Sequence, residues 1–238
     1  MPVLNRWSDA DAAAAVAQYG AQGVAEPLAL RTYSARLLGA DPDLVLHGGG
    51  NTSVKTSVTG LLGETIPVLC VKGSGWDLGT IEPPGHPAVR LEPLRALRAL
   101  AALSDEAMVA AQRNNLIDPA APNPSVEALL HAFLPHTFVD HTHSSALLAL
   151  ADQPDAAAVC RQVFGERVVL VPYVMPGFAL AQSCADLYEE AAERAAASGV
   201  ELEGMVLLKH GLFSFGATAK QSYCLLYTSD AADEEDSV

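Results

Sequence analysis

The sequence predicts an α/β protein with a mixed, largely antiparallel sheet flanked by helices. Short β-rich runs separated by glycine-rich turns follow two early helical patterns, and helices then alternate with further short apolar runs. Such a mixture is typical of sheets built partly from hairpins rather than of doubly wound parallel sheets. The glycine run at residues 48–50 leads toward another strand and not into a helix, so a dinucleotide-binding fingerprint is absent from it.

Capping and stop signals in the sequence predict where the helices begin and end. Ser8 can cap a first helix with Asp11 three residues later, and this helix is expected to stop at Gly20. Gly199 stops a long alanine-rich helix in the same way. The other predicted helices occupy residues 27–38, 91–103, 104–113, 125–134, 146–150 and 154–164, the long one covers 179–197, and a last one begins near residue 217.

Strands are predicted where short apolar and β-branched runs lie between turn residues. Asp41 and Pro42 break the second helix, after which the period changes from that of a helix to that of strands. The predicted strands occupy residues 44–46, 53–58, 66–71, 137–142, 167–171 and 205–208.

Composition narrows the class of protein. The chain has 238 residues, half of them apolar, which suits one domain or two small ones with a substantial core. No run approaches the roughly 20 apolar residues of a membrane span, and no export signal is visible, so a cytoplasmic protein is expected. Four widely spaced cysteines suit a reducing compartment. A net charge of −14 without a basic cluster argues against a nucleic-acid partner.

The last fifteen residues differ from the rest of the chain. They are polar and acidic and have no apolar period, and the stretch CLLYTSDAADE resembles translated adapter sequence of the kind found at the ends of gene fragments. We therefore expect one domain over residues 1–223, truncated at its C-terminal end, and a non-native or disordered tail over 224–238. A natural disordered acidic tail is the alternative.

Histidines at two predicted strand ends suggest a metal site. In the run VDHTH, His141 and His143 are two residues apart in a strand, so both rings can reach one ion. His210 ends another apolar strand and is followed by a glycine, which allows a sharp turn beside a site. Each feature alone is more often structural. Three histidines together fit the open, three-ligand arrangement of catalytic zinc.

Glu127 is a candidate general base. In the run NPSVE, Ser125 can cap a helix and Glu127 falls in its first turn, where the helix dipole favours a carboxylate. The plain interpretation is therefore a helix-start acid, and the functional one is a base beside the metal. His131 lies four residues on, on the same helical face, and is expected to support or pack rather than to bind the ion.

Two glycine-rich turns suit a bound phosphate. The runs HGGGNTS and KGSG offer backbone N–H groups with hydroxyl, amide and ammonium donors, although each alone is also an ordinary hairpin turn. Combined with a metal site, they point to a small phosphorylated substrate.

Six runs in order give the sequence a specific resemblance. HGGGNTS, VKGSGWDL, NPSVEALLHAFLP, VDHTHSSAL, VPYVMPGFAL and LLKHGL resemble the class II aldolase/adducin head family over about residues 25–223. Within it, the chain looks most like the aldolase half of bifunctional rhamnulose-1-phosphate aldolase/short-chain dehydrogenase proteins. The resemblance implies a three-layer α/β/α fold and a homotetramer with sites between subunits. It places zinc ligands at His141, His143 and His210, the catalytic glutamate at Glu127, and phosphate contacts at Gly50, Asn51, Ser74, Gly75 and Ser125.

By resemblance, the implied reaction is reversible cleavage of a ketose 1-phosphate, L-rhamnulose 1-phosphate, to dihydroxyacetone phosphate and L-lactaldehyde. Other divalent first-row ions could replace zinc. One departure is Val126, where many small-sugar aldolases of the family have a second serine. The resemblance also implies a dehydrogenase domain downstream in the intact protein. A sugar-phosphate 4-epimerase and a non-catalytic adducin-like binding domain remain the alternatives.

Overall fold

A single mixed sheet organises the part of the chain that the computed structural model describes, residues 5–228. It has seven strands in the order β3-β2-β1-β4-β7-β6-β5, and β5 beside β6 is its parallel pair. The strands are β1 (Asn51–Thr59), β2 (Thr65–Val71), β3 (Ala88–Arg90), β4 (Phe138–Thr142), β5 (Val168–Val171), β6 (Gly204–Leu207) and β7 (Gly211–Gly216). The predicted mixed, largely antiparallel sheet is confirmed.

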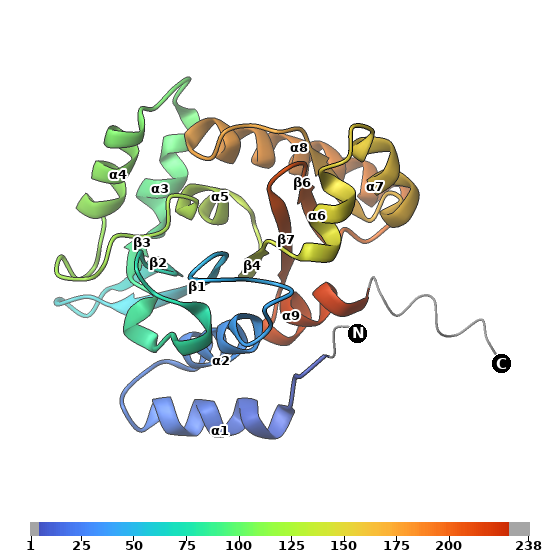
Figure 1. The fold of residues 1–238 in the computed structure, drawn as a ribbon. Coiled ribbons are helices and arrows are strands. Elements are labelled where there is room, and N and C mark those ends of the chain that lie inside the picture. Colours follow the sequence, from blue (N-terminus) through green and yellow to red (C-terminus); the bar gives the residue numbers. More distant parts are fainter. Residues whose placement is uncertain (1–4, 229–238) are drawn as a thin grey trace.

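Helices cover both faces of this sheet (Figure 1). The helices are α1 (Asp9–Gly20), α2 (Glu26–Gly39), α3 (Leu91–Ala96), α4 (Asp105–Asn114), α5 (Ala128–Phe133), α6 (Ser145–Ala151), α7 (Ala156–Phe164), α8 (Phe178–Ser198) and α9 (Ala219–Thr228). Short 3-10 turns occupy Leu78–Thr80, Pro83–Gly85 and Leu97–Ala99. Among residues 5–228, no helix combines the length and apolar character needed to cross a bilayer.

Alternating strand residues separate the two sides of the core. On β4, Val139 belongs to the main apolar cluster, which includes residues of α3, α5 and α8, whereas Phe138 belongs to a cluster on the opposite face. The side chains of α2 and α9 pack on that opposite face. This alternation follows from the two-residue period of a strand. It places His141 on the same face as α5, which carries the residues that follow Glu127.

Several local predictions need correction. Residues 44–46, predicted as a strand, form no strand: Leu44 ends a turn in which its N–H donates to the Asp41 carbonyl, and Val45 and Leu46 follow without regular structure. Leu44 and Val45 are buried without strand partners, so their apolar character reflects core packing and not a ladder. Two strands, β3 and β7, were not predicted, because one is very short and glycines bound the other.

The start of one helix and the end of another also differ from their predicted positions. The helix predicted over 125–134 begins only at Ala128, since Ser125 accepts a hydrogen bond from the Glu127 N–H in a tight turn before it. At the C-terminal end, α9 continues past residue 223 to Thr228, and Leu226 packs in an apolar cluster with Tyr223. Helical order thus crosses the predicted boundary between domain and tail. Most of the predicted tail, 229–238, lies outside the described residues.

Candidate metal centre

Two of the three predicted metal ligands lie at the end of β4. His141 is the penultimate residue of the strand and is fully buried, and His143 follows directly after the strand. The His143 N–H donates to the Leu44 carbonyl at 3.0 Å, which fixes the chain beyond the strand end. The Nε2 atoms of the two rings are 2.9 Å apart. The two rings therefore lie close enough to reach one point, as predicted for a shared ion.

The third predicted ligand comes from the turn between β6 and β7. His210 is the last residue of this tight turn, in which Lys209 adopts a φ of 60°. The centroid of its ring lies 5.1 Å from that of His141 and 5.6 Å from that of His143.

Gly211 explains how the hairpin comes so close to β4. A Cβ atom at this position would lie 2.5 Å from the Thr142 carbonyl oxygen and 2.9 Å from Cε1 of His141. Only glycine lets the start of β7 approach β4 this closely. From the sequence this glycine was expected to turn the chain, whereas in the structure it makes room for the histidine rings.

The three histidines form a donor set that a metal ion fits. Each offers one ring nitrogen, and these atoms all lie within 4.8 Å of one another. The Nδ1 atom of His141 donates to the Leu212 carbonyl at 3.0 Å, so the lone pair of its Nε2 is available. Zinc–nitrogen bonds of about 2.0–2.1 Å in tetrahedral geometry separate neighbouring ligands by about 3.3 Å. The cluster can therefore close around such an ion with small movements.

Glu127 lies against two of these rings. Its Oε1 is 3.2 Å from Nε2 of His210, and its Oε2 is 3.4 Å from Nε2 of His141. Oε1 is buried and has no hydrogen-bond partner among the described residues. A lone pair facing a carboxylate oxygen is unfavourable unless a cation lies between them. This arrangement is a second reason why a metal ion fits here.

The electrostatics of the site favour a carboxylate beside neutral imidazoles. Burial lowers the pKa of His141 to about 4 and also lowers the pKa of His143. Burial alone would raise the pKa of the Glu127 carboxyl, but the His141 and His210 rings and a hydrogen bond from Asn51 hold that pKa well below its usual range. Neutral imidazole is the form that binds a metal ion.

The two glycine-rich turns lie side by side near the histidines. Lys72 Nζ donates to the Gly48 carbonyl at 2.8 Å, and the Gly48 N–H donates to Asp77 at 3.1 Å. Together the turns line one hollow of about 370 Å³, to which His47, Gly48, Gly75, Trp76 and Asp77 contribute. A Cβ on Gly49 would lie 3.8 Å from Nδ1 of His143, so the first turn borders the metal cluster.

The five predicted phosphate contacts fall into two groups. Ser74 and Gly75 are exposed in the second turn, where Gly75 has a φ of 87°. Gly50, Asn51 and Ser125 lie closer to Glu127, since Asn51 Nδ2 contacts both Ser125 Oγ at 3.2 Å and Glu127 Oε2 at 2.6 Å. The contact between Asn51 and Glu127 was not predicted, because 76 residues separate the two in the sequence.

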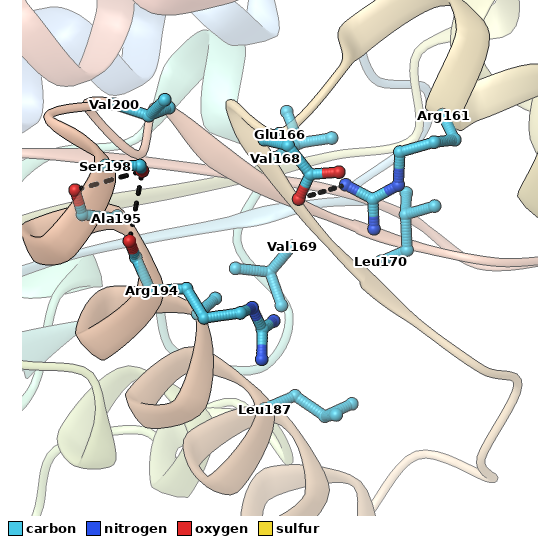
Figure 2. Close-up of a pocket in the computed structure, with 11 residues that line it drawn as sticks. Arg161, Glu166, Val168, Val169, Leu170, Leu187, Arg194, Ala195, Ser198 and Val200 are labelled. Atoms are coloured by element: carbon cyan, nitrogen blue, oxygen red, sulfur yellow. Dashed lines mark hydrogen bonds and ion pairs between the residues drawn. The ribbon is translucent and has the colours of Figure 1, made fainter.

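A second cavity lies away from the histidines. It has a volume of about 90 Å³ and lies between β5 and α8, with a mixed lining in which Val169 and Leu187 are apolar and Arg194 and Ser198 are polar (Figure 2). Arg161 at its rim pairs with Glu166 at 3.3 Å. It shares no residue with the histidine cluster or with the two glycine turns. This cavity is therefore separate from the metal centre.

A comparison with known protein families shows which family the chain belongs to. The family described as class II aldolase and adducin N-terminal domain matches residues 31–234. The chain belongs to this family. A class II aldolase domain from Thermoplasma acidophilum, the N-terminal domain of a conserved protein, has 36% identical sequence and a TM-score of 0.80, with 96% of each chain covered.

Two further proteins are similar to this class II aldolase domain. It is 37% identical over 191 residues to the uncharacterized oxidoreductase YuxG of Bacillus subtilis (strain 168). That match covers 80% of this chain but only 27% of the relative, so the chain spans about a quarter of that protein. An L-fuculose-1-phosphate aldolase from Thermus thermophilus shares the fold, with a TM-score of 0.52, 18% identity and coverage of 87% and 90%.

Proposed function

We propose that this domain is a zinc-dependent lyase that reversibly cleaves a ketose 1-phosphate to dihydroxyacetone phosphate and an aldehyde. The observation that carries the proposal is the convergence of His141, His143 and His210 on the buried carboxylate of Glu127. A non-catalytic binding domain has no need for a carboxylate buried beside three clustered imidazoles.

Each group of residues has a task in this reaction. The three histidines hold the ion, which as a Lewis acid would polarise the oxygens next to the bond that breaks. Glu127 carries the proton to and from the carbon that becomes negatively charged when the carbon–carbon bond is cleaved. The backbone N–H groups of the two glycine turns, with Ser74 and Ser125, hold the phosphate.

L-Rhamnulose 1-phosphate is the substrate we propose, with L-lactaldehyde as the second product. Support comes from the resemblance of the six sequence runs to the aldolase half of the bifunctional aldolase/dehydrogenase proteins. The name and length of the Bacillus subtilis relative agree, because it is described as an oxidoreductase and is much longer than this chain. We propose on the same basis that the intact protein carries a dehydrogenase domain, is cytoplasmic and forms a homotetramer.

The test is product analysis with metal-loaded protein. L-Rhamnulose 1-phosphate should yield dihydroxyacetone phosphate, detected by a coupled reductase, and a chelator should abolish the release. L-Fuculose 1-phosphate serves as the comparison substrate, because it reports on stereochemical preference. Formation of one isomeric sugar phosphate in place of two fragments would identify a 4-epimerase. Failure to bind a stoichiometric metal ion would identify a binding domain.

A further inference from the structure

The edge of the sheet at β5 is open. Within the described residues, β5 is the last strand of the sheet and pairs with β6 alone. The Leu208 N–H donates to the Val171 carbonyl at 3.0 Å, so Val171 directs its backbone groups toward β6. Because these directions alternate along a strand, Val168 and Leu170 direct their N–H and C=O groups away from β6. No described strand pairs with them on that side.

Small residues of α8 open a groove beside this edge. Ala191 and Ala195 lie about one helical turn apart on the side of α8 that faces β5, and Leu187 continues the same row. Their short side chains leave the cavity of about 90 Å³, with Val169 of β5 on its other wall (Figure 2). At about 30 Å³ for each molecule of liquid water, the cavity suits roughly three or four heavy atoms, such as the end of a valine or leucine side chain.

Charge at the mouth of the groove favours an acidic partner. Among the described residues that line it, Arg161 and Arg194 are cationic and Glu166 is acidic, whereas the whole chain carries a net charge of −14. Arg161 pairs with Glu166 at 3.3 Å, and Arg194 pairs with Glu190 at 4.0 Å. All four side chains are at least 42% exposed. Exposed pairs of this kind are weak, so both guanidinium groups are available to a carboxylate from outside.

We propose that the edge of β5 and the groove beside α8 bind an extended acidic peptide of a partner protein. The peptide adds a strand to the sheet by pairing with the backbone groups of Val168 and Leu170. One aliphatic side chain of the peptide fills the cavity, and the carboxylates on either side of it pair with Arg161 and Arg194. The groove shares no residue with the histidine cluster, so the partner and the substrate bind at different places.

Peptide chemistry is the first test. The probe is a seven-residue peptide of alternating glutamate and valine, blocked at both ends. One control peptide has lysine in place of glutamate, and another has proline in place of the central valine, which removes an N–H that strand pairing uses. Calorimetry with the full chain should show saturable binding of the acidic peptide and roughly tenfold or greater loss of affinity for each control. Absence of saturable binding, or equal binding of the lysine peptide, would overturn the proposal.

Two substitutions with matched controls locate the binding site. Ala195→Leu fills the groove and Arg194→Ala removes one cation, and each should lower the affinity for the acidic peptide roughly tenfold. Ala196→Leu and Glu193→Ala make similar changes at exposed positions of α8 and should leave the affinity within about twofold of the unmodified protein. Arg194 is exposed, so its variant is informative even if the larger side chain at Ala195 disturbs folding. Equal affinities in a variant and its control would place the peptide elsewhere and contradict the assignment.

Hydrogen exchange tests the strand pairing directly. In the free protein, the amides of Val168 and Leu170 should exchange faster than those of Val169 and Val171, which face β6. Bound acidic peptide should slow the exchange of Val168 and Leu170 roughly tenfold or more. Unchanged exchange at saturating peptide would exclude strand addition. Protection of the same two amides that rises with protein concentration, without peptide, would show that a second copy of the chain occupies the edge, and would also overturn the proposal.

Discussion

At the scale of single residues, the site combines one carboxylate with three imidazoles, and burial lowers the pKa of two of them, His141 and His143. Glu127 is only 8% exposed, and the hydrogen bond that the Asn51 amide donates to its Oε2 favours the ionised carboxylate. The same burial keeps His141 neutral and ready to bind an ion. A buried acid and buried bases therefore hold the forms that the proposed chemistry requires.

Glu127→Gln should abolish most of the catalytic activity while leaving the metal in place. The amide keeps the shape of the carboxyl but cannot accept a proton, so we expect kcat to fall roughly 10²- to 10⁴-fold. Metal content by atomic absorption should be unchanged. Glu193→Gln, on the exposed side of α8, is the control and should behave like the unmodified protein. Near-normal kcat in Glu127→Gln would remove Glu127 from the mechanism.

Loss of a residue that hydrogen-bonds a metal ligand typically lowers metal affinity roughly 10- to 100-fold. We expect His141→Ala to lower the metal affinity by more than this. The reason is that the change removes a ligand whose Nε2 contacts both His143 and Glu127. Competition with a chelator measures the affinity. His136→Gln is the matched control, since this ring packs on Phe215 and Tyr188 and is not one of the clustered ligands. Equal affinities in the two variants would contradict the assignment.

At the scale of elements, the hairpin of β6 and β7 brings His210 to the other two histidines from a distant part of the sequence. β7 pairs with β4 from Phe138 opposite Gly216 to Thr142 opposite Leu212, so the hairpin end meets the end of β4 that carries His141. The register of this pair decides whether His210 faces the other histidines. Gly211 is the residue that allows the contact.

Gly211→Ala should therefore lower both stability and metal affinity. The new methyl group would overlap the Thr142 carbonyl and the His141 ring, and such overpacking typically costs about 1–3 kcal/mol. Urea unfolding and chelator competition measure the two effects. Gly20→Ala is the control, because a Cβ there meets nothing within 4 Å. A Gly211→Ala protein with normal metal affinity would show that the hairpin can shift without disturbing the site.

A buried ion pair joins three elements on the opposite face of the sheet. Arg31 of α2 lies 2.5 Å from Oδ1 of Asp140 in β4, with both side chains fully buried, and Ser222 of α9 donates to Oδ2 of Asp140 at 2.6 Å. Asp140 is the neighbour of His141, so this pair also fixes the strand that carries His141 and leads into His143.

Asp140→Asn should destabilise the protein strongly. The change keeps the volume but leaves the Arg31 guanidinium without a buried anion, and breaking such a pair typically costs about 3–5 kcal/mol. Urea unfolding measures the loss. Asp9→Asn breaks an exposed pair with Lys220 and should change the free energy of unfolding very little. Similar effects in the two variants would mean that water or other groups replace the missing carboxylate.

At the scale of the whole molecule, buried histidines link stability to pH. Burial lowers the pKa of His86 to about 3, with further lowering by Arg31 and Lys72, and its ring contacts Thr52 at 3.0 Å. In the unfolded chain a histidine titrates near 6.5. Between these values the unfolded state binds more protons than the folded state, so stability is fully present above about pH 6.5 and is lost as the pH falls toward 3.

His86→Gln should flatten this dependence. The slope of the free energy of unfolding against pH should fall by up to roughly 1.4 kcal/mol per pH unit between about pH 6 and 4. Urea unfolding at several pH values gives the slope. Gln cannot take up a proton, so the variant separates the contribution of His86 from those of the other buried histidines. An identical slope in both proteins would show that His86 takes up no proton on unfolding in this range.

The sequence alone determined the composition of the site and the class of the fold. Residue spacing is enough to predict that the rings of His141 and His143 lie close together and that alternating helices and strands build a mixed sheet, although His143 follows β4 and His210 lies in the turn after β6. These conclusions hold because they depend on local periodicity and on residue chemistry. The same reasoning suggested Glu127 as a base and the two glycine-rich turns as a phosphate site, and the family resemblance then gave the individual phosphate contacts.

Only the tertiary structure decided how distant residues meet. The pairing of β7 with β4, the need for Gly211 beside the rings, and the contact between Asn51 and Glu127 involve residues separated by about 70 or more positions. The local sequence around Leu44 and Val45 predicts a strand. The two residues form none, because they are buried by core packing and not by pairing with a neighbouring strand. Side-chain type follows from sequence, but the partner of each buried polar atom follows from sheet register and helix packing.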